Sequence, residues 1–420
     1  YNKLTSSNII WEELVTNTES GYQLKSQLNF FDSLISNQKI QQLINNQPIT
    51  TSIHLAGPKN YNFIFYVPTI TSVEEQSFIK ELKTLTKSNP STRVYENVTI
   101  YNFPITEKQK LALIYHKNII AFSYSTILIE DVIRQLSADN SLLNNYSFKK
   151  TMKTSGQVDD GNLFINHNYF QKLSATFLNS TNKEYLKGFE DYASWSALDA
   201  GVKNNAITLN GFSLATDTNN NYLNLFKNQK PQEHDFLTIT PNNTAFIYFY
   251  GFSNSKAFFK ERKTLLKANN NFFNYEKYID QQNEAFGIDL EEELVSYIGN
   301  ELAFIITEPI TDDYSPEKFI IFQAIDIDKT LNSLANIALK TGIDTSSIQY
   351  KEFKIQQIGL SKMFSNLFGK PFFDIDRPFF TSIDDYIVFG ASENAIKSFI
   401  NKNIVEKTLD NDANFNSFRD

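Results

Sequence analysis

The feature that most constrains the fold of this chain is an internal repeat. Residues 117–148 read KNIIAFSYSTILIEDVIRQLSADNSLLNNYSF, residues 384–415 read DDYIVFGASENAIKSFINKNIVEKTLDNDANF, and the two segments align without a gap. Both follow one pattern, a short strand, a turn and a helix with i, i+4 apolar spacing, with Ser125 and Ser392 at the helix N-cap. The identical pairs are Ile120/Ile387, Phe122/Phe389, Ser125/Ser392, Ile129/Ile396, Ile133/Ile400, Leu142/Leu409, Asn144/Asn411 and Phe148/Phe415. The repeat predicts two copies of one module.

The segments upstream of the repeat predict the same order of elements in both copies. Residues 62–67 (NFIFYV) match residues 318–323 (KFIIFQ), and each strand follows another one across a turn-rich stretch. A helix and further strands then lead into the shared strand–helix unit. The fold class we expect is α+β, with tandem repeated modules, each a mainly antiparallel sheet with helices packed on one face.

Three segments follow from this pattern. We place a first α+β module at residues 1–160, a connecting strand–helix–hairpin segment at 161–235 and a second α+β module at 236–420. A helix without a preceding strand is expected at 9–16, so we expect the first module to be truncated at its N-terminus and the second at its C-terminus. The sequence starts at Tyr1 rather than Met, so we expect any export signal or membrane anchor to lie outside it.

Composition excludes several classes of function. The 420 residues contain no cysteine, which excludes disulfides, cysteine-ligated metals and thiol nucleophiles, and fits an oxidising compartment. The formal net charge is −8 and no basic run is present, so nucleic acid is not an expected partner. The apolar stretches are of strand length, far short of the roughly 20 residues that span a bilayer.

Two segments carry a family resemblance. Residues 237–249 read LTITPNNTAFIYF, and residues 286–307 read FGIDLEEELVSYIGNELAFIIT. With the tandem arrangement, this Pro-x-x-Thr-Ala strand entry and this Ile-Gly-x-Glu strand entry resemble the bacterial envelope family catalogued as domain of unknown function 3352. The first copy has Gln47-Pro48-Ile49-Thr50 where the second motif would stand. The resemblance implies an exported or membrane-anchored protein and implies no activity.

No group of histidines or serines has the spacing of a catalytic site. The histidines are dispersed and are interpreted as hydrogen-bonded or surface residues; they are His54, His116, His167 and His234. The serines of Ser123-Tyr124-Ser125 and Ser194-Trp195-Ser196 have no histidine beside them and are interpreted as strand and cap residues. We therefore predict no catalytic residue and no cofactor.

Acidic pairs are more frequent, but they are interpreted as structural. Carboxylates alternate at Asp326 and Asp328 and at Asp374 and Asp376, whereas the glycine and glutamate that complete an EF-hand loop are missing. We expect Asp328 to be a helix N-cap and the others to form turns. No metal ligand is predicted.

One aromatic cluster is the candidate binding site. Residues 368–378 form a loop with no counterpart of equal length in the first copy, and extra loops often carry function. An apolar groove for a partner would use four rings in and next to this loop, Phe372, Phe373, Phe379 and Phe380. The alternative, which we favour, is that these rings pack in the core.

The sequence thus predicts a protein of unknown function, and we expect a non-catalytic cell-envelope scaffold or binding protein. The partner would be a protein or an apolar ligand. A carrier that holds an apolar small ligand (lipid, peptide or glycan) between sheet and helices is the second hypothesis, and a hydrolase is the third. The expected location is extracytoplasmic, in the periplasm or cell envelope.

Overall fold

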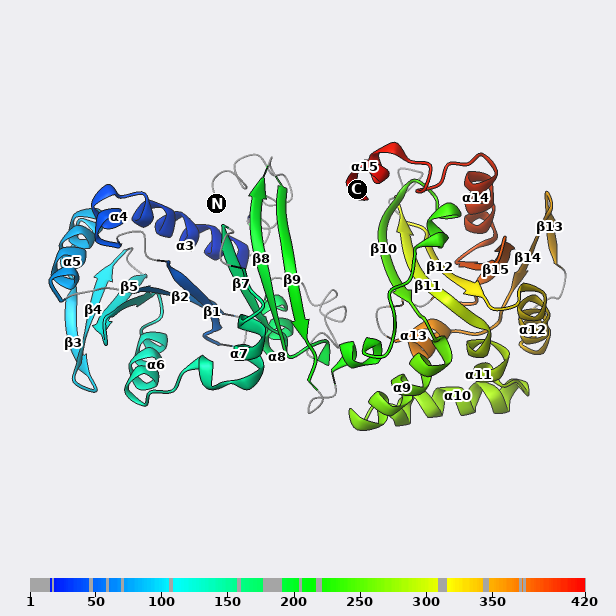
Figure 1. Ribbon diagram of the computed structural model, residues 1–420, viewed down its shortest axis with the longest axis horizontal. Coiled ribbons are helices and arrows are strands. Elements are labelled where there is room, and N and C mark those ends of the chain that lie inside the picture. Colours follow the sequence, from blue (N-terminus) through cyan, green and yellow to red (C-terminus); the bar gives the residue numbers. More distant parts are fainter. Residues whose placement is uncertain are drawn as a thin grey trace. The chain divides into compact units, whose positions relative to one another are not determined.

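The computed structural model shows two compact units, residues 1–216 and 217–420 (Figure 1). It describes residues 16, 19–44, 48–57, 60–68, 72–105, 109–156, 160–176, 191–203, 206–216, 221–308, 316–342, 347–369, 372 and 375–419. The helix expected at 9–16 lies outside these residues except for Thr16. The residues predicted as a connecting segment, 161–235, are divided between the two units.

The first unit is built on a six-stranded antiparallel sheet. Its strands are β1 (Thr50–Leu55), β2 (Tyr61–Pro68), β3 (Ser91–Tyr95), β4 (Val98–Pro104), β5 (Lys110–His116) and β6 (Ile119–Ser123), in the order β1-β2-β6-β5-β4-β3. Its helices are α3 (Glu19–Ile35), α4 (Gln38–Ile44), α5 (Ser72–Thr86) and α6 (Thr126–Ser137). Both faces of the sheet are apolar. Successive side chains along each strand point to opposite faces, and apolar residues occupy both sets of positions.

A smaller antiparallel sheet completes the first unit. It consists of β7 (Gly161–Asn166), β8 (Trp195–Lys203) and β9 (Ala206–Leu214), flanked by η1 (Leu142–Asn144), α7 (Tyr146–Met152) and α8 (His167–Ser174). Phe148 of α7 packs on Phe164 and Trp195, with ring centroids 5.4 and 4.9 Å away. Aromatic packing therefore attaches α7 to this sheet.

The second unit is built on a seven-stranded antiparallel sheet. Its strands are β10 (Thr244–Gly251), β11 (Ile298–Thr307), β12 (Lys318–Ala324), β13 (Ile348–Tyr350), β14 (Phe353–Gln357), β15 (Phe379–Ile383) and β16 (Tyr386–Gly390), in the order β10-β11-β12-β16-β15-β14-β13. Its helices are η4 (Tyr222–Phe226), η5 (Asp235–Thr238), α9 (Ser255–Ala268), α10 (Phe272–Phe286), α11 (Leu290–Glu293), η6 (Val295–Tyr297), α12 (Ile327–Lys340), α13 (Met363–Phe368), α14 (Glu393–Ile404) and α15 (Ala413–Arg419).

The α+β class predicted from the sequence is confirmed, but the helices cover both faces of each large sheet rather than one. In the second unit, α12 shares a core cluster with Ile320 and Phe322, whereas α14 shares another with Phe319 and Ile321. In the first unit, α3, α4 and α5 cover one face and α6 covers the other (Figure 1). The physical reason is that strands such as β12 are apolar on both faces, which only a second layer of helices can bury.

The two large sheets share one strand order. Strands β1-β2-β6-β5-β4-β3 of the first unit correspond to β11-β12-β16-β15-β14-β13 of the second, and β10 is an additional edge strand. This common order supports the predicted repeat, which remains a proposal.

Strand pairing corrects the alignment of residues 62–67 with residues 318–323 by one residue. Phe122 pairs with Phe65 and the matching Phe389 pairs with Ile320, so Ile320, not Ile321, corresponds to Phe65.

Among the described residues, no helix is both long enough and apolar enough to cross a membrane.

Candidate functional site

Three of the four aromatic candidate residues pack in the core instead of on a shared surface. Phe372 is fully buried, and its ring lies 5.1 Å from Tyr250, 5.4 Å from Phe368 and 5.8 Å from Tyr248, measured between centroids. Phe380 is also buried. Phe379, which precedes Phe380 in β15, packs on the opposite face of the sheet. Phe373 lies outside the described residues.

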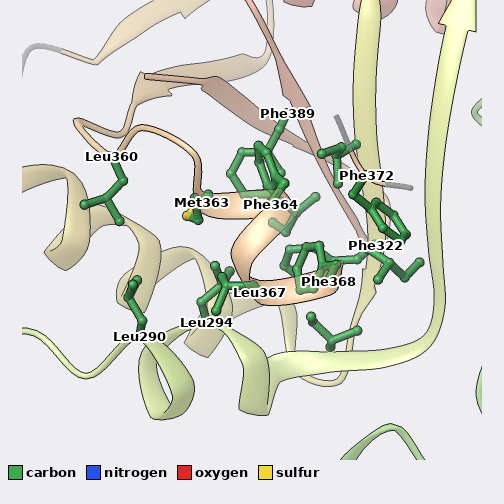
Figure 2. Close-up of a cluster of buried hydrophobic side chains, with 14 of the residues drawn as sticks. Leu290, Leu294, Phe322, Leu360, Met363, Phe364, Leu367, Phe368, Phe372 and Phe389 are labelled. Atoms are coloured by element: carbon green, nitrogen blue, oxygen red, sulfur yellow. The ribbon is translucent and has the colours of Figure 1, made fainter. Parts of the chain in front are cut away.

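Helix α13 explains why the aromatic loop turns inward. Met363, Phe364, Leu367 and Phe368 are almost completely buried, and Figure 2 shows them gathered with Phe372, Phe389 and Leu294 in one apolar cluster. The insertion between β14 and β15 therefore fills space between sheet and helices in the second unit. The same connection in the first unit, between β4 and β5, spans residues 105–109 alone.

The first unit instead has an open groove on the face that α6 covers. The groove has a volume of about 470 Å³ and lies between strands β1–β2 and helix α6. Its apolar floor is made by Ile64, Leu128 and Val132. The polar residues of its wall and rim are His54, Tyr66, Asp131, Arg134, Gln135 and Asn140.

The polar groups of the groove form two hydrogen-bonded sets. On the strand side, Ser52 Oγ lies 2.8 Å from His54 Nε2, and the Tyr66 hydroxyl is hydrogen-bonded to Ser52. Burial lowers the pKa of His54 below its usual 6.5 and raises the pKa of Tyr66, so both side chains are neutral at neutral pH. This set offers neutral hydrogen-bonding groups without a fixed charge.

On the helix side, the charges at the rim are paired. Arg134 forms an ion pair with Asp131, and its Nη1 donates to the Tyr95 hydroxyl at 2.6 Å. The guanidinium also lies over the Tyr95 ring, 5.9 Å from its centroid. A ligand in the groove would thus meet an apolar floor, neutral polar groups and one neutralised ion pair.

The corresponding position in the second unit is filled by the chain itself. There, Phe236 and Leu237 of η5, with Ile239 after it, are buried in the cluster that contains Ile305 of β11 and Ile396 of α14. The backbone N–H groups of Asp235 and Phe236 donate to the Glu301 carboxylate at 2.8 and 2.9 Å, and the Tyr386 hydroxyl donates to it at 2.6 Å.

One of the side chains that hold this segment in the second unit has no polar counterpart in the first. Ile119 of β6 stands at the position of Tyr386 of β16, because Ile119 pairs with His116 and Tyr386 pairs with Ile383 at the start of the matching strands. The Ile119 side chain has no polar atom, so it cannot donate the hydrogen bond that the Tyr386 hydroxyl makes to Glu301.

The outer edge of the two sheets differs in the same region. In the second unit β10 pairs antiparallel with β11 along the strand, whereas β1, the counterpart of β11, is an edge strand. Within the ranges that the structure describes, β2 is the one strand that pairs with β1. The groove and the open edge of β1 adjoin, and we treat them together as the candidate site.

Structure also reveals a serine–histidine contact that the sequence did not suggest. His167 Nε2 lies 2.7 Å from Ser196 Oγ, which lies 2.6 Å from Ser213 Oγ. Ser196 is a strand residue of β8, as predicted, and its histidine partner lies 29 residues away in the sequence. The pairing joins the start of α8 to β8 and β9, and no local pattern signals it. Burial lowers the pKa of His167, and its Nδ1 is buried without a hydrogen-bond partner.

Neither serine–histidine pair has the third group of a catalytic triad. In the part of the chain that the structure describes, no carboxylate is hydrogen-bonded to His54 or His167. Nucleophilic catalysis needs a base that such a group orients. The described residues also contain no group of three or more His, Asp or Glu side chains that could hold a metal ion. Asp374 lies outside them.

The described residues define a two-unit α+β protein with a groove beside the edge strand β1. The chain belongs to the family described as "Protein of unknown function (DUF3352)", whose profile matches residues 32–420. This confirms the resemblance carried by residues 237–249 and 286–307. Searches of curated proteins and of solved structures found no match.

Proposed function

We propose that this protein is a non-catalytic binding protein of the cell envelope and that the groove between β1–β2 and α6 is its binding site. The observation that carries the proposal is the groove itself. Its floor is formed by Ile64, Leu128 and Val132, and polar side chains of β1, β2 and α6 line its wall and rim. A concave site with an apolar floor and a few convergent polar groups is the usual form of a ligand site.

The chemistry of the groove supports binding over catalysis. Ser52, His54 and Tyr66 hydrogen-bond in a neutral set, and Arg134 is neutralised by Asp131. Such groups recognise a ligand but supply neither an activated nucleophile nor a charged acid–base pair. The hydrolase is therefore the least favoured function.

A carrier of a small apolar ligand is the second candidate. The groove volume of about 470 Å³ falls within the roughly 300–1,000 Å³ of small-molecule sites. Native mass spectrometry of the protein purified from its source distinguishes a carrier of a small ligand from a protein that binds another protein. A co-purified small molecule that is lost when Ala138 at the rim is replaced by Trp supports the carrier.

The envelope location is supported by the cysteine-free sequence, since thiols are at risk in an oxidising compartment. Fractionation of source cells, with an antibody against the second unit, tests this part of the proposal. Recovery in the cytoplasmic fraction would contradict it.

Site-specific photocrosslinking tests the binding site. A photoreactive amino acid replaces Gln135, which is exposed at the groove, and in a matched control it replaces Ile127, which is exposed on the same helix outside the groove. We expect an adduct of defined mass in source cells at position 135 and none at 127. Adducts at neither position, from variants whose circular dichroism is unchanged, would overturn the proposal.

A further inference from the structure

We infer that helix α9 of the second unit docks on an anionic lipid surface through a row of lysines, with the Phe273 ring entering the lipid. The groove proposed as a binding site belongs to the first unit, so the two sites can be tested separately. Proteins that lie on membranes combine basic side chains with exposed apolar ones, and each Lys or Arg near an anionic surface strengthens binding. Helices α9 and α10 form the lower border of the second unit in Figure 1.

Four lysines form a single row along α9, which we call the lysine row. Intervals of four, three and four residues place their side chains within about 60° of one another around the helix axis. Glu261, the one acidic residue of α9, lies about 130° from the centre of the row. In a chain whose formal net charge is −8, the row reverses the charge locally. The lysine row consists of Lys256, Lys260, Lys263 and Lys267.

Contacts within the second unit account for only part of the lysine row. Lys256, the second residue of α9, stands where the helix dipole disfavours a positive charge. Lys256 and Lys260 are exposed, and neither belongs to an ion pair formed by the described residues. Lys263 differs, because its Nζ lies 2.5 Å from a carboxylate oxygen of Glu291. The exposed lysines that the row offers to a partner are therefore Lys256, Lys260 and Lys267.

An exposed aromatic side chain follows the end of the lysine row. Lys267 Nζ lies 4.5 Å from the centroid of the Phe272 ring, and Phe273 is the next residue of α10. Phe273 is 69% exposed, more than any other large apolar side chain that the structure describes in the second unit. An acidic protein would need the lysines alone. The exposed ring favours a lipid surface, because lipid can bury the ring while its headgroups meet the lysines.

Co-sedimentation of the 420-residue chain with lipid vesicles tests the inference. The vesicles consist of phosphatidylcholine alone or of phosphatidylcholine with about 30% phosphatidylglycerol, which is anionic. We expect the chain to bind the anionic vesicles at about 0.05 M salt and to bind them at least about tenfold more weakly at about 0.5 M, because salt screens the lysines. Neutral vesicles should not bind it.

Two matched triple variants locate the binding. Both remove three positive charges from exposed lysines of the second unit, and circular dichroism checks that both are folded. We expect the variant of the lysine row to bind anionic vesicles at least about tenfold more weakly and the control to bind like the wild type. The first variant carries Lys256→Gln, Lys260→Gln and Lys267→Gln, and the control carries Lys329→Gln, Lys354→Gln and Lys407→Gln.

A second pair of variants tests the aromatic contact. Phe273→Ser removes the exposed ring, and Leu339→Ser removes a side chain of α12 that is 60% exposed. We expect Phe273→Ser to weaken binding to anionic vesicles at least about threefold, whereas Leu339→Ser should leave it unchanged.

Several outcomes would overturn the inference. Equal binding to neutral and anionic vesicles, no binding to either, or equal losses in the two triple variants would each do so. Binding to soluble polyglutamate without binding to anionic vesicles would identify an acidic protein as the partner, which also contradicts the lipid surface assigned here. Binding unaffected by Phe273→Ser would show that the ring does not enter the lipid.

Discussion

At the residue scale, Phe372 tests whether the inserted aromatic loop belongs to the core. The ring is completely buried against Tyr248, Tyr250 and Phe368. We expect Phe372→Ala to lower the free energy of unfolding by about 3–5 kcal/mol, because it leaves a cavity. Phe273→Ala on α10, where the ring is 69% exposed, should change the free energy by less than about 0.5 kcal/mol. Urea denaturation measures both, and an unaffected Phe372→Ala would contradict the buried placement.

Glu301 gives a pH prediction. Burial raises its pKa above 4.5, although hydrogen bonds from Tyr386 and from the backbone of Asp235 and Phe236 oppose the shift. The unfolded chain therefore loses this proton first as pH rises. Hence the contribution of Glu301 to the free energy of unfolding falls as pH rises from 4.5 through the folded pKa.

Replacement of Glu301 by Gln removes this titration. We expect the stability of the wild-type protein relative to Glu301→Gln to decrease between pH 4.5 and neutral pH, as measured by urea denaturation of both proteins at each pH. A relative stability that rises over this interval would show that the hydrogen bonds, not burial, dominate.

Local signals identified some residues correctly and missed those that depend on distant contacts. Ser125 and Ser392 are helix N-caps as predicted, because capping depends on a few adjacent residues. The N-cap of α12 is Asp326 and not Asp328, which is the second residue of the helix. The Ser196–His167 contact spans 29 residues and could not be predicted from spacing.

At the element scale, helix starts common to both units can be tested. The Ser392 side chain accepts from the Ala395 N–H at 3.1 Å at the start of α14. We expect Ser392→Ala to cost about 1 kcal/mol of stability, whereas Ser392→Asp, which keeps an oxygen acceptor, should cost little. Thermal unfolding of the three proteins measures this. Equal losses in both variants would mean that the side chain acts by something other than capping.

Strand pairing was more predictable than the arrangement of helices. Period and turn signals located the strands and hairpins, but the one-residue offset between Phe65 and Ile320 shows that register needs the partner strand, since a slip of one residue exchanges the faces. The groove was not predictable, because it is lined by side chains of β1, β2 and α6 that are far apart in sequence.

At the scale of the whole molecule, the two units have separate cores. Each of the four core clusters formed by the described residues draws all its members from one unit. We expect residues 217–420, expressed alone, to unfold cooperatively and to retain the circular dichroism of a folded α+β protein. A fragment that stays unfolded would show that its stability depends on residues 1–216.

The central claim is that the first unit has a groove between β1–β2 and α6 beside the edge strand β1. Hydrogen–deuterium exchange of this chain tests the claim most directly. Strand β1 should exchange faster than β11, which has neighbours on both sides. Equal protection of β1 and β11 would contradict the account.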